Sequence, residues 1–250
     1  MKLAFSTLGC PNFTWPEIYT MAKDLGFKGI EVRGVGKEIS AVKAQPFSDE
    51  QLPQTKQKMA ELRLEIPCLT SGCCLKFAEK AEENHAEIVQ YITLASRLGT
   101  PYVRVLADLE PHVTGEVDDG VVLAALQRLA PVAEEEGVTL LVETNGVYAD
   151  TARLCKLLDQ VASDSVAALW DLHHPYRFAG ETPGKTVQNL GVYIKYVHIK
   201  DSIVEDGKTR YRMMGEGDLP IDDMMLALRS IKYDGYVSLE WVKRWAADLD

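Results

Sequence analysis

Short apolar runs rich in Val, Ile, Leu and Tyr recur along this chain of 250 residues, and helical patterns separate them. Seven of the eight runs are followed by a helical pattern. The eight runs span residues 2–9, 29–34, 65–72, 102–108, 140–145, 167–174, 196–201 and 236–241. Strict alternation of strands and helices with short turns requires a parallel sheet. Because a closed (β/α)8 barrel typically has about 250 residues, we predict an α/β protein, an eight-stranded parallel TIM barrel, with one domain over residues 1–250.

The two ends of the chain carry different helical signals. Thr14 and Glu17 have the spacing of a capping box, and Ile18, Met21 and Leu25 follow at helical spacing, so the first helix should begin after Thr14. The first strand-to-helix turn lacks the G-x-G-x-x-G of a dinucleotide-binding fold. After the eighth run only residues 242–250 follow, so we expect the closing helix of the barrel to be short or absent.

Four strand-like runs in the second half each end in a side chain that can bind a divalent cation: Glu143, Asp171, His198 and Glu240. A charge placed directly after apolar residues would cost several kcal/mol if it were desolvated without a partner. In a TIM barrel the C-terminal ends of the strands converge on one pocket, which would bring the four side chains together. Three carboxylates and one imidazole favour Mn²⁺ or Mg²⁺, and Co²⁺ or Zn²⁺ is also compatible.

Each of these residues also has a purely structural interpretation. A glutamate at a strand end often pairs with a basic residue of a neighbouring strand, and Arg104 and Lys200 are available for that role. A single histidine between apolar residues, such as His198, is more often a hydrogen-bonded core residue than a ligand. The coincidence of four such residues at four strand ends nevertheless favours a metal site over four separate explanations.

Other polar side chains at strand ends are candidates to support the metal ligands or to contact the substrate. They are Glu31, Arg33, Arg104, Asn145 and Lys200, together with Arg212 in the segment after the seventh run. For Arg33 and Arg104, a salt bridge with Glu31 or Asp108 is an equally good interpretation.

The formal charge of −10 and the isoelectric point near 5.1 argue against a nucleic-acid partner, since no basic run offsets them. No apolar run approaches the ~18 to 20 residues that span a bilayer. We therefore expect a cytoplasmic protein without a membrane partner.

The order Glu143, Asp171 with His174 three residues later, His198 and Glu240 resembles that of the xylose-isomerase-like TIM barrels. This sugar phosphate isomerase/epimerase group includes ketose 3-epimerases, hydroxypyruvate isomerase and inosose dehydratase. The closing segment 233–241 and the Gly-Glu-Gly-Asp turn at 215–218 are also typical of it, and the resemblance spans essentially the whole chain.

The resemblance implies a role for each residue of the candidate site. Glu143 and Glu240 correspond to metal-bound glutamates that act as an acid/base pair, Asp171 and His198 to residues that only bind the metal, and His174 to a histidine that contacts substrate oxygens. A ketose that chelates the metal would form a cis-enediolate after loss of a proton. The implied activity is that of a divalent-metal-dependent isomerase or epimerase of a sugar or sugar phosphate. An inosose dehydratase-like lyase is the alternative, since loss of hydroxide from the same intermediate gives dehydration.

This chain departs from the ketose 3-epimerase pattern at one position, and two other classes of protein are alternatives. Ketose 3-epimerases carry a substrate-binding arginine where this chain has Val204, a role that Arg210 or Arg212 could take over.

Endonuclease IV shares the metal signature but needs extra histidines on strands 3 and 4, where this chain has Thr70 and Arg104. A non-catalytic sugar-binding barrel would need no metal. We expect a small sugar or polyol ketone as partner, and a dimer or tetramer is common among such barrels.

Overall fold

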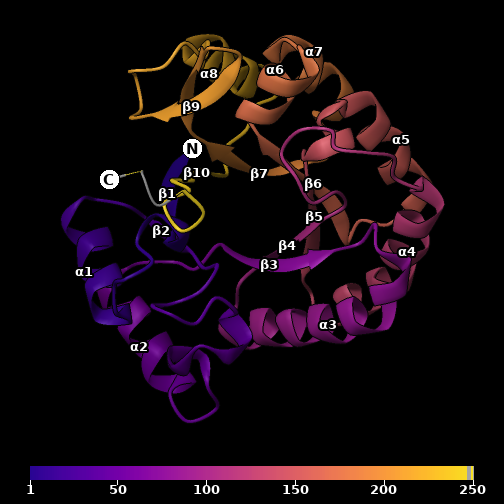
Figure 1. Ribbon diagram of the computed structural model, residues 1–250. Coiled ribbons are helices and arrows are strands. Elements are labelled where there is room, and N and C mark those ends of the chain that lie inside the picture. The colour runs from indigo at the N-terminus through magenta and orange to yellow at the C-terminus, as the bar shows by residue number, and fades with distance from the viewer. Residues whose placement is uncertain (247–248, 250) are drawn as a thin grey trace.

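Eight parallel strands form a barrel in the computed structural model, which describes residues 1–246 and 249 (Figure 1). The barrel strands are β1 Lys2–Ser6, β2 Gly29–Glu31, β3 Cys68–Cys74, β4 Tyr102–Leu106, β5 Thr139–Glu143, β6 Val166–Asp171, β7 Ile194–Ile199 and β10 Tyr236–Leu239. Their order is β2-β1-β10-β7-β6-β5-β4-β3. The parallel bridge from Gly29 to Glu65 joins β2 to the segment before β3, and the bridge from Val32 to Leu69 joins the residue after β2 to the second residue of β3. The predicted eight-stranded parallel TIM barrel is therefore confirmed.

The helices surround the barrel, as Figure 1 shows. They are α1 Trp15–Asp24, α2 Leu52–Leu62, α3 Ala81–Leu98, α4 Asp119–Glu135, α5 Thr151–Val161, α6 His173–Ala179, α7 Pro183–Leu190 and α8 Ile221–Ser230. Short 3-10 turns lie at Thr7–Gly9, Ala41–Lys43, Gln45–Phe47, Ala78–Lys80 and Gly146–Ala149. The predicted capping box is confirmed, because the backbone N–H of Thr14 donates to the Glu17 carboxylate at 2.7 Å.

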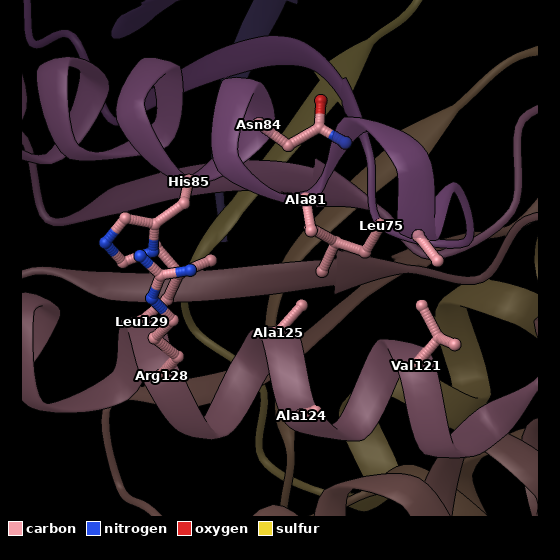
Figure 2. A pocket seen from close by; sticks show the side chains of 10 residues that line it. Leu75, Ala81, Asn84, His85, Val121, Ala124, Ala125, Arg128 and Leu129 are labelled. Atoms are coloured by element: carbon pink, nitrogen blue, oxygen red, sulfur yellow. The ribbon is translucent and has the colours of Figure 1, made fainter.

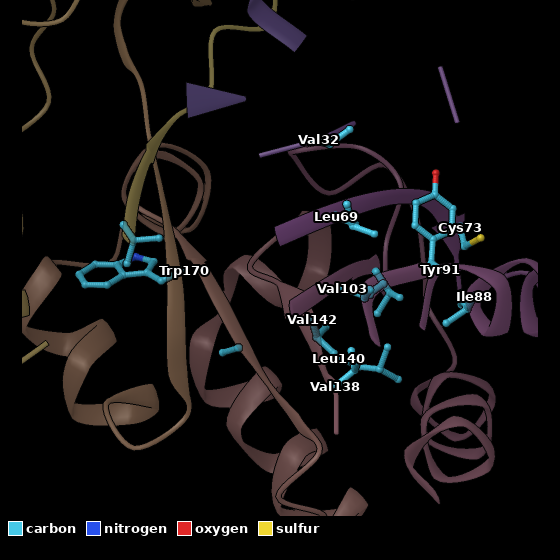
Figure 3. Packing of buried hydrophobic residues seen from close by; sticks show 14 of the residues in the cluster. Val32, Leu69, Cys73, Ile88, Tyr91, Val103, Val138, Leu140, Val142 and Trp170 are labelled. Atoms are coloured by element: carbon cyan, nitrogen blue, oxygen red, sulfur yellow. The ribbon is translucent and has the colours of Figure 1, made fainter. Parts of the chain in front are cut away.

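Two sets of buried apolar residues occupy the two sides of the strands. The larger set lies between strands and helices, and Figure 3 shows Ile88 and Tyr91 of α3 beside Val103 of β4. The smaller set contains only strand residues from around the barrel, so it fills the interior. Its members are Ala4, Cys68, Leu141, Ala167, Leu169, Tyr196 and Tyr236. This interior layer forms the floor on which the polar strand ends lie.

The connections at β7 and β10 depart from the regular alternation. An antiparallel hairpin of β8 Asp201–Glu205 and β9 Lys208–Arg212 follows β7 before α8 begins. After β10 the described residues 240–246 and 249 contain no helix, as expected, while residues 247, 248 and 250 lie outside the described part. Instead, the Arg244 backbone N–H donates to the Leu8 carbonyl, and its guanidinium donates to the Gly36 carbonyl. This segment therefore packs against the loops that follow β1 and β2.

Within the described residues, no helix has both the length and the apolar character needed to cross a membrane.

Candidate active site

The two-residue period of the strands brings the four predicted metal ligands to the inner side of the barrel. Side chains two residues apart point to the same face of a strand. Glu143 lies two residues after the interior Leu141, and Asp171 and His198 stand in the same relation to Leu169 and Tyr196. Glu240 lies four residues after the interior Tyr236. The barrel thus gathers all four above its apolar floor.

Ligand atoms of Glu143, Asp171, His198 and Glu240 all lie within 4.8 Å of one another, and the four residues are buried. The His198 Nδ1 atom is 3.4 Å from Glu143 Oε1, 3.4 Å from Glu240 Oε1 and 3.8 Å from Asp171 Oδ2. It is buried and has no hydrogen-bond partner among the described residues. A buried imidazole nitrogen that faces three carboxylate oxygens is the arrangement that a dication would complete.

Glu31 explains why Nδ1 rather than Nε2 faces the cluster. The Nε2 atom of His198 lies 3.0 Å from Glu31 Oε2, and both side chains are fully buried. If Nε2–H donates to Glu31, the Nδ1 lone pair remains for a metal ion, as in other carboxylate, histidine and metal triads. Of the two roles that the sequence allows for Glu31, the structure favours support of a candidate metal ligand, because Glu31 lies behind His198.

Two buried cations balance part of the negative charge. Lys200 Nζ donates to Asp171 and, at 2.5 Å, to Glu240, while Arg104 Nε lies 3.1 Å from Glu143 Oε2. Burial alone would raise the pKa of the Glu143 and Glu240 carboxyls. The charge of Arg104 outweighs this effect at Glu143, and the charge of Lys200 outweighs it at Glu240, so both pKa values lie below the ordinary value.

Asp171 and His198 shift in the opposite direction. Burial, Glu240 and Glu143 raise the pKa of the Asp171 carboxyl against the effect of Lys200. Burial lowers the pKa of His198, but Glu31 and Glu240 outweigh this effect and leave the pKa well above its ordinary value. When Asp171 is ionised and His198 is neutral, the carboxylates of Glu31, Glu143, Asp171 and Glu240 contribute a charge of −4. Lys200 and Arg104 contribute +2, which leaves a net charge of −2. A single dication would cancel that charge, so the donor set and its charge both fit a divalent metal ion.

His174 is held in one tautomer at the edge of the cluster. Its Nδ1 atom lies 3.1 Å from the Thr144 carbonyl oxygen, which can only accept, so Nδ1 carries the proton. Burial and Lys200 lower the pKa of His174 to about 3, so the ring is neutral near pH 7. Its Nε2 atom, 3.6 Å from Asp171 Oδ2, is therefore a hydrogen-bond acceptor.

A cavity of about 570 Å³ opens above the cluster, and five of the seven side chains predicted to contact the substrate or support the site line it. They are His174, Arg33, Arg104, Asn145 and Lys200. Asn145 is fixed by hydrogen bonds from Nδ2 to the carbonyls of Asp108 and Leu109. Glu31 lies behind His198, and Arg212 does not line the cavity either; it lies in β9 with Nη2 3.9 Å from Glu205 Oε2.

Tyr211 is a cavity residue that our sequence analysis missed. It pairs with Ser202 across the hairpin, lines the cavity with Lys200, and its ring centroid lies 5.6 Å from that of His173. The signal was present in the sequence, because Asp206-Gly207 is a typical two-residue hairpin turn. Both residues adopt positive φ, 50° and 71°, as such a turn requires. Counting outward from that turn pairs Ser202 with Tyr211.

A second hollow of about 270 Å³ lies between α3 and α4, away from the strand ends (Figure 2). Small apolar side chains such as Ala81, Ala125 and Val121 line most of it, and His85 and Arg128 lie on one side. Arg128 is paired with Glu82. This hollow lacks the convergent carboxylates of the barrel mouth.

A family model described as the xylose isomerase-like TIM barrel matches residues 20–250. Fructoselysine 3-epimerase of Escherichia coli O157:H7 is 23% identical over 252 residues, which cover 97% of this chain and 90% of that protein. Uncharacterized protein MJ1311 of Methanocaldococcus jannaschii is 24% identical over 211 residues, which cover 81% of this chain but only 64% of that protein. Among solved structures, the IOLI protein with a binding zinc atom superimposes with a TM-score of 0.80 at 18% identity, covering 97% of this chain and 89% of that one.

Proposed function

Since the chain belongs to the xylose isomerase-like TIM barrel family, we propose that it is a divalent-metal-dependent isomerase or epimerase of a sugar or sugar phosphate. The observation that carries this proposal is the buried cluster of Glu143, Asp171, His198 and Glu240 at the mouth of the barrel. The curated relative named as a fructoselysine 3-epimerase supports the same class of reaction.

Four side chains would hold the metal ion: Glu143, Asp171, Glu240 and the Nδ1 atom of His198. Their hard oxygen ligands favour Mn²⁺ or Mg²⁺, with Co²⁺ or Zn²⁺ also compatible. A bound dication would polarise a substrate carbonyl and so make the neighbouring C–H more acidic.

The two glutamates would move the protons. Arg104 favours the ionised form of Glu143, and Lys200 favours that of Glu240, so either carboxylate can accept a proton near pH 7. One glutamate would remove the proton next to the carbonyl and pass it to solvent. The other would take up a proton from solvent and donate it to the resulting cis-enediolate. The neutral His174 would accept a hydrogen bond from a substrate hydroxyl through Nε2 and orient the substrate.

Exchange of solvent deuterium into the substrate tests this proposal, because proton abstraction comes before epimerisation, isomerisation and dehydration alike. We expect the metal-loaded protein to exchange deuterium into at least one member of a panel of ketoses, ketose phosphates, hydroxypyruvate and inososes. Chelation of the metal should stop the exchange. The absence of exchange into every member with the metal bound would contradict the proposal, and the product of a positive member would identify the reaction.

Glu31 should control the affinity for the metal without binding the metal itself. We expect Glu31→Gln to weaken metal binding by about 10- to 100-fold, because the charged partner of His198 is lost while the side-chain shape is kept. Calorimetric titration of the apo protein with Mn²⁺ measures the effect. The matched control is Glu134→Gln on the exposed face of α4, which should bind Mn²⁺ like the wild type. Equal affinity in Glu31→Gln would show that Glu31 does not tune the site.

A further inference from the structure

Arg33 lies across the barrel mouth from the centre of the metal cluster. It follows β2, and β2 and β6 are on opposite sides of the eight-stranded ring, so Arg33 faces the side that carries Asp171. The same cavity is lined by Arg33 and by Glu143, Lys200 and Glu240. A substrate that reaches the metal cluster therefore shares its cavity with the Arg33 guanidinium.

Arg33 differs from the other two cations of the cavity in its partners. Arg104 is paired with Glu143, and Lys200 with Asp171 and Glu240. For Arg33, no carboxylate of residues 1–246 or 249 lies within 4.0 Å of the guanidinium, so the ion pair with Glu31 considered in the sequence analysis does not form. Glu87 attracts the guanidinium only from beyond ion-pair distance. An anionic ligand in the cavity would therefore be the counter-ion that Arg33 binds directly.

The guanidinium is held in place but keeps most of its donors free. Its Nη1 donates to the Ile39 carbonyl at 2.6 Å, and its Cζ lies 5.9 Å from the centroid of the Trp245 ring. A guanidinium has five N–H donors, and this hydrogen bond uses one of them. The described residues make no hydrogen bond to the other four donors, and Arg33 lines the cavity.

Gly72 in β3 gives the guanidinium the space to reach the cavity. A Cβ atom at Gly72 would lie 2.6 Å from Arg33 Nη2, closer than side-chain contacts allow. Gly72 lines the cavity together with Arg33. A side chain at position 72 would therefore displace the guanidinium from the place it occupies.

We propose that the substrate carries an anionic group, a carboxylate or a phosphate, which Arg33 binds at the side of the cavity opposite Asp171. This inference rests on the proposed function and adds the substrate class to it. The planar guanidinium can donate two parallel, charge-assisted hydrogen bonds to either group. Glu110 also lines the cavity, but it is exposed, so water and salt screen its repulsion of an anion.

Polyols without a ketone or aldehyde group cannot undergo the proposed reaction, so they test the inference separately from catalysis. D-glucitol, D-gluconate and D-glucitol 6-phosphate share a hydroxylated chain and differ in the terminal group. Calorimetric titration of the metal-free protein avoids chelation of the metal by gluconate. We expect at least one of the two anions to bind about tenfold or more tightly than glucitol, as a hydrogen bond to a charged group implies. The tighter anion identifies the carboxylate or the phosphate as the natural group.

Three variants link this preference to Arg33. Arg33→Gln should abolish the preference for the anion, and Arg33→Lys should retain part of it because the charge remains. The control is Arg229→Gln, which removes the same charge from the exposed face of α8 and should keep the full preference. Thermal unfolding of all variants checks that they are folded.

The inference is overturned if neither anion binds more tightly than glucitol to the wild type, or if Arg33→Gln keeps the preference. An equal loss in Arg229→Gln would also overturn it, since the effect would then come from the overall charge. These outcomes are independent of deuterium exchange. Failure of exchange with normal anion binding would refute the proposed reaction, whereas exchange with equal affinity for all three polyols would refute only the role of Arg33.

Discussion

Replacing Glu143 or Glu240 by glutamine should lower deuterium exchange into the substrate by about 10³-fold or more, since general acid/base catalysis alone contributes about 10² to 10⁴. Glutamine keeps the size of the side chain and one oxygen that can bind a metal, but it cannot accept a proton near pH 7. The loss should appear in kcat more than in KM, because both carboxylates act on the reacting carbon atoms. Exchange followed by NMR in D₂O measures each variant under metal saturation.

The matched control for both variants is Glu134→Gln, which changes the same functional groups on the exposed face of α4 and should retain full exchange. Metal content must be measured for each variant, because loss of a ligand also lowers affinity. Full exchange in both Glu143→Gln and Glu240→Gln with the metal bound would eliminate the acid/base assignment. If only one variant retained exchange, the other glutamate would be the base that starts the reaction.

Lys200→Met should destabilise the metal-free protein by about 3 to 5 kcal/mol, the usual effect of removing one partner from a buried ion pair. The Lys200 ammonium is fully buried and bridges Asp171 and Glu240. Without it, those carboxylates lose the cation that offsets their mutual repulsion. Urea unfolding of the chelated protein measures the free energy of unfolding, and Mn²⁺ should reduce the deficit because it supplies positive charge to the same carboxylates.

The control for this variant is Lys156→Met on the exposed side of α5, which should change the free energy of unfolding by less than about 0.5 kcal/mol. Equal stability of wild type and Lys200→Met without metal would show that Lys200 does not balance the cluster charge. A deficit that Mn²⁺ leaves unchanged would show that the ion and Lys200 do not act on the same carboxylates.

The gathering of the four ligands could be predicted from the sequence because it depends on the backbone alone. Each candidate ligand lies at or directly after the end of a strand, and the two-residue period fixes its direction once an interior residue such as Leu141 or Tyr196 is known. The position of Lys200 depends instead on the path of a long flexible side chain. The sequence leaves two roles open for Lys200, a substrate contact and a salt-bridge partner of a strand-end glutamate. In the structure it lines the cavity and also bridges Asp171 and Glu240.

The substrate side of the cavity was predicted less well, because it is built from connections rather than from barrel strands. The sequence predicts Arg212 as the contact from the segment after β7, interpreted as a loop. In the structure this segment forms a hairpin, and its pairing brings Tyr211 to the cavity instead. Val204, where the ketose 3-epimerase pattern has arginine, lies exposed in β8. The unpaired state of Arg33 depends on the side chains around it and could not be derived from spacing.

Anomalous scattering from crystals grown with Mn²⁺ tests the central claim most directly, because it locates the ion without reference to activity. We predict one strong peak per chain, bound by Glu143, Asp171, Glu240 and the Nδ1 atom of His198, with Glu31 retained on Nε2. A fully loaded ion bound elsewhere, or no peak at this cluster while Lys200 still bridges Asp171 and Glu240, would contradict the assignment of the cluster as a metal centre.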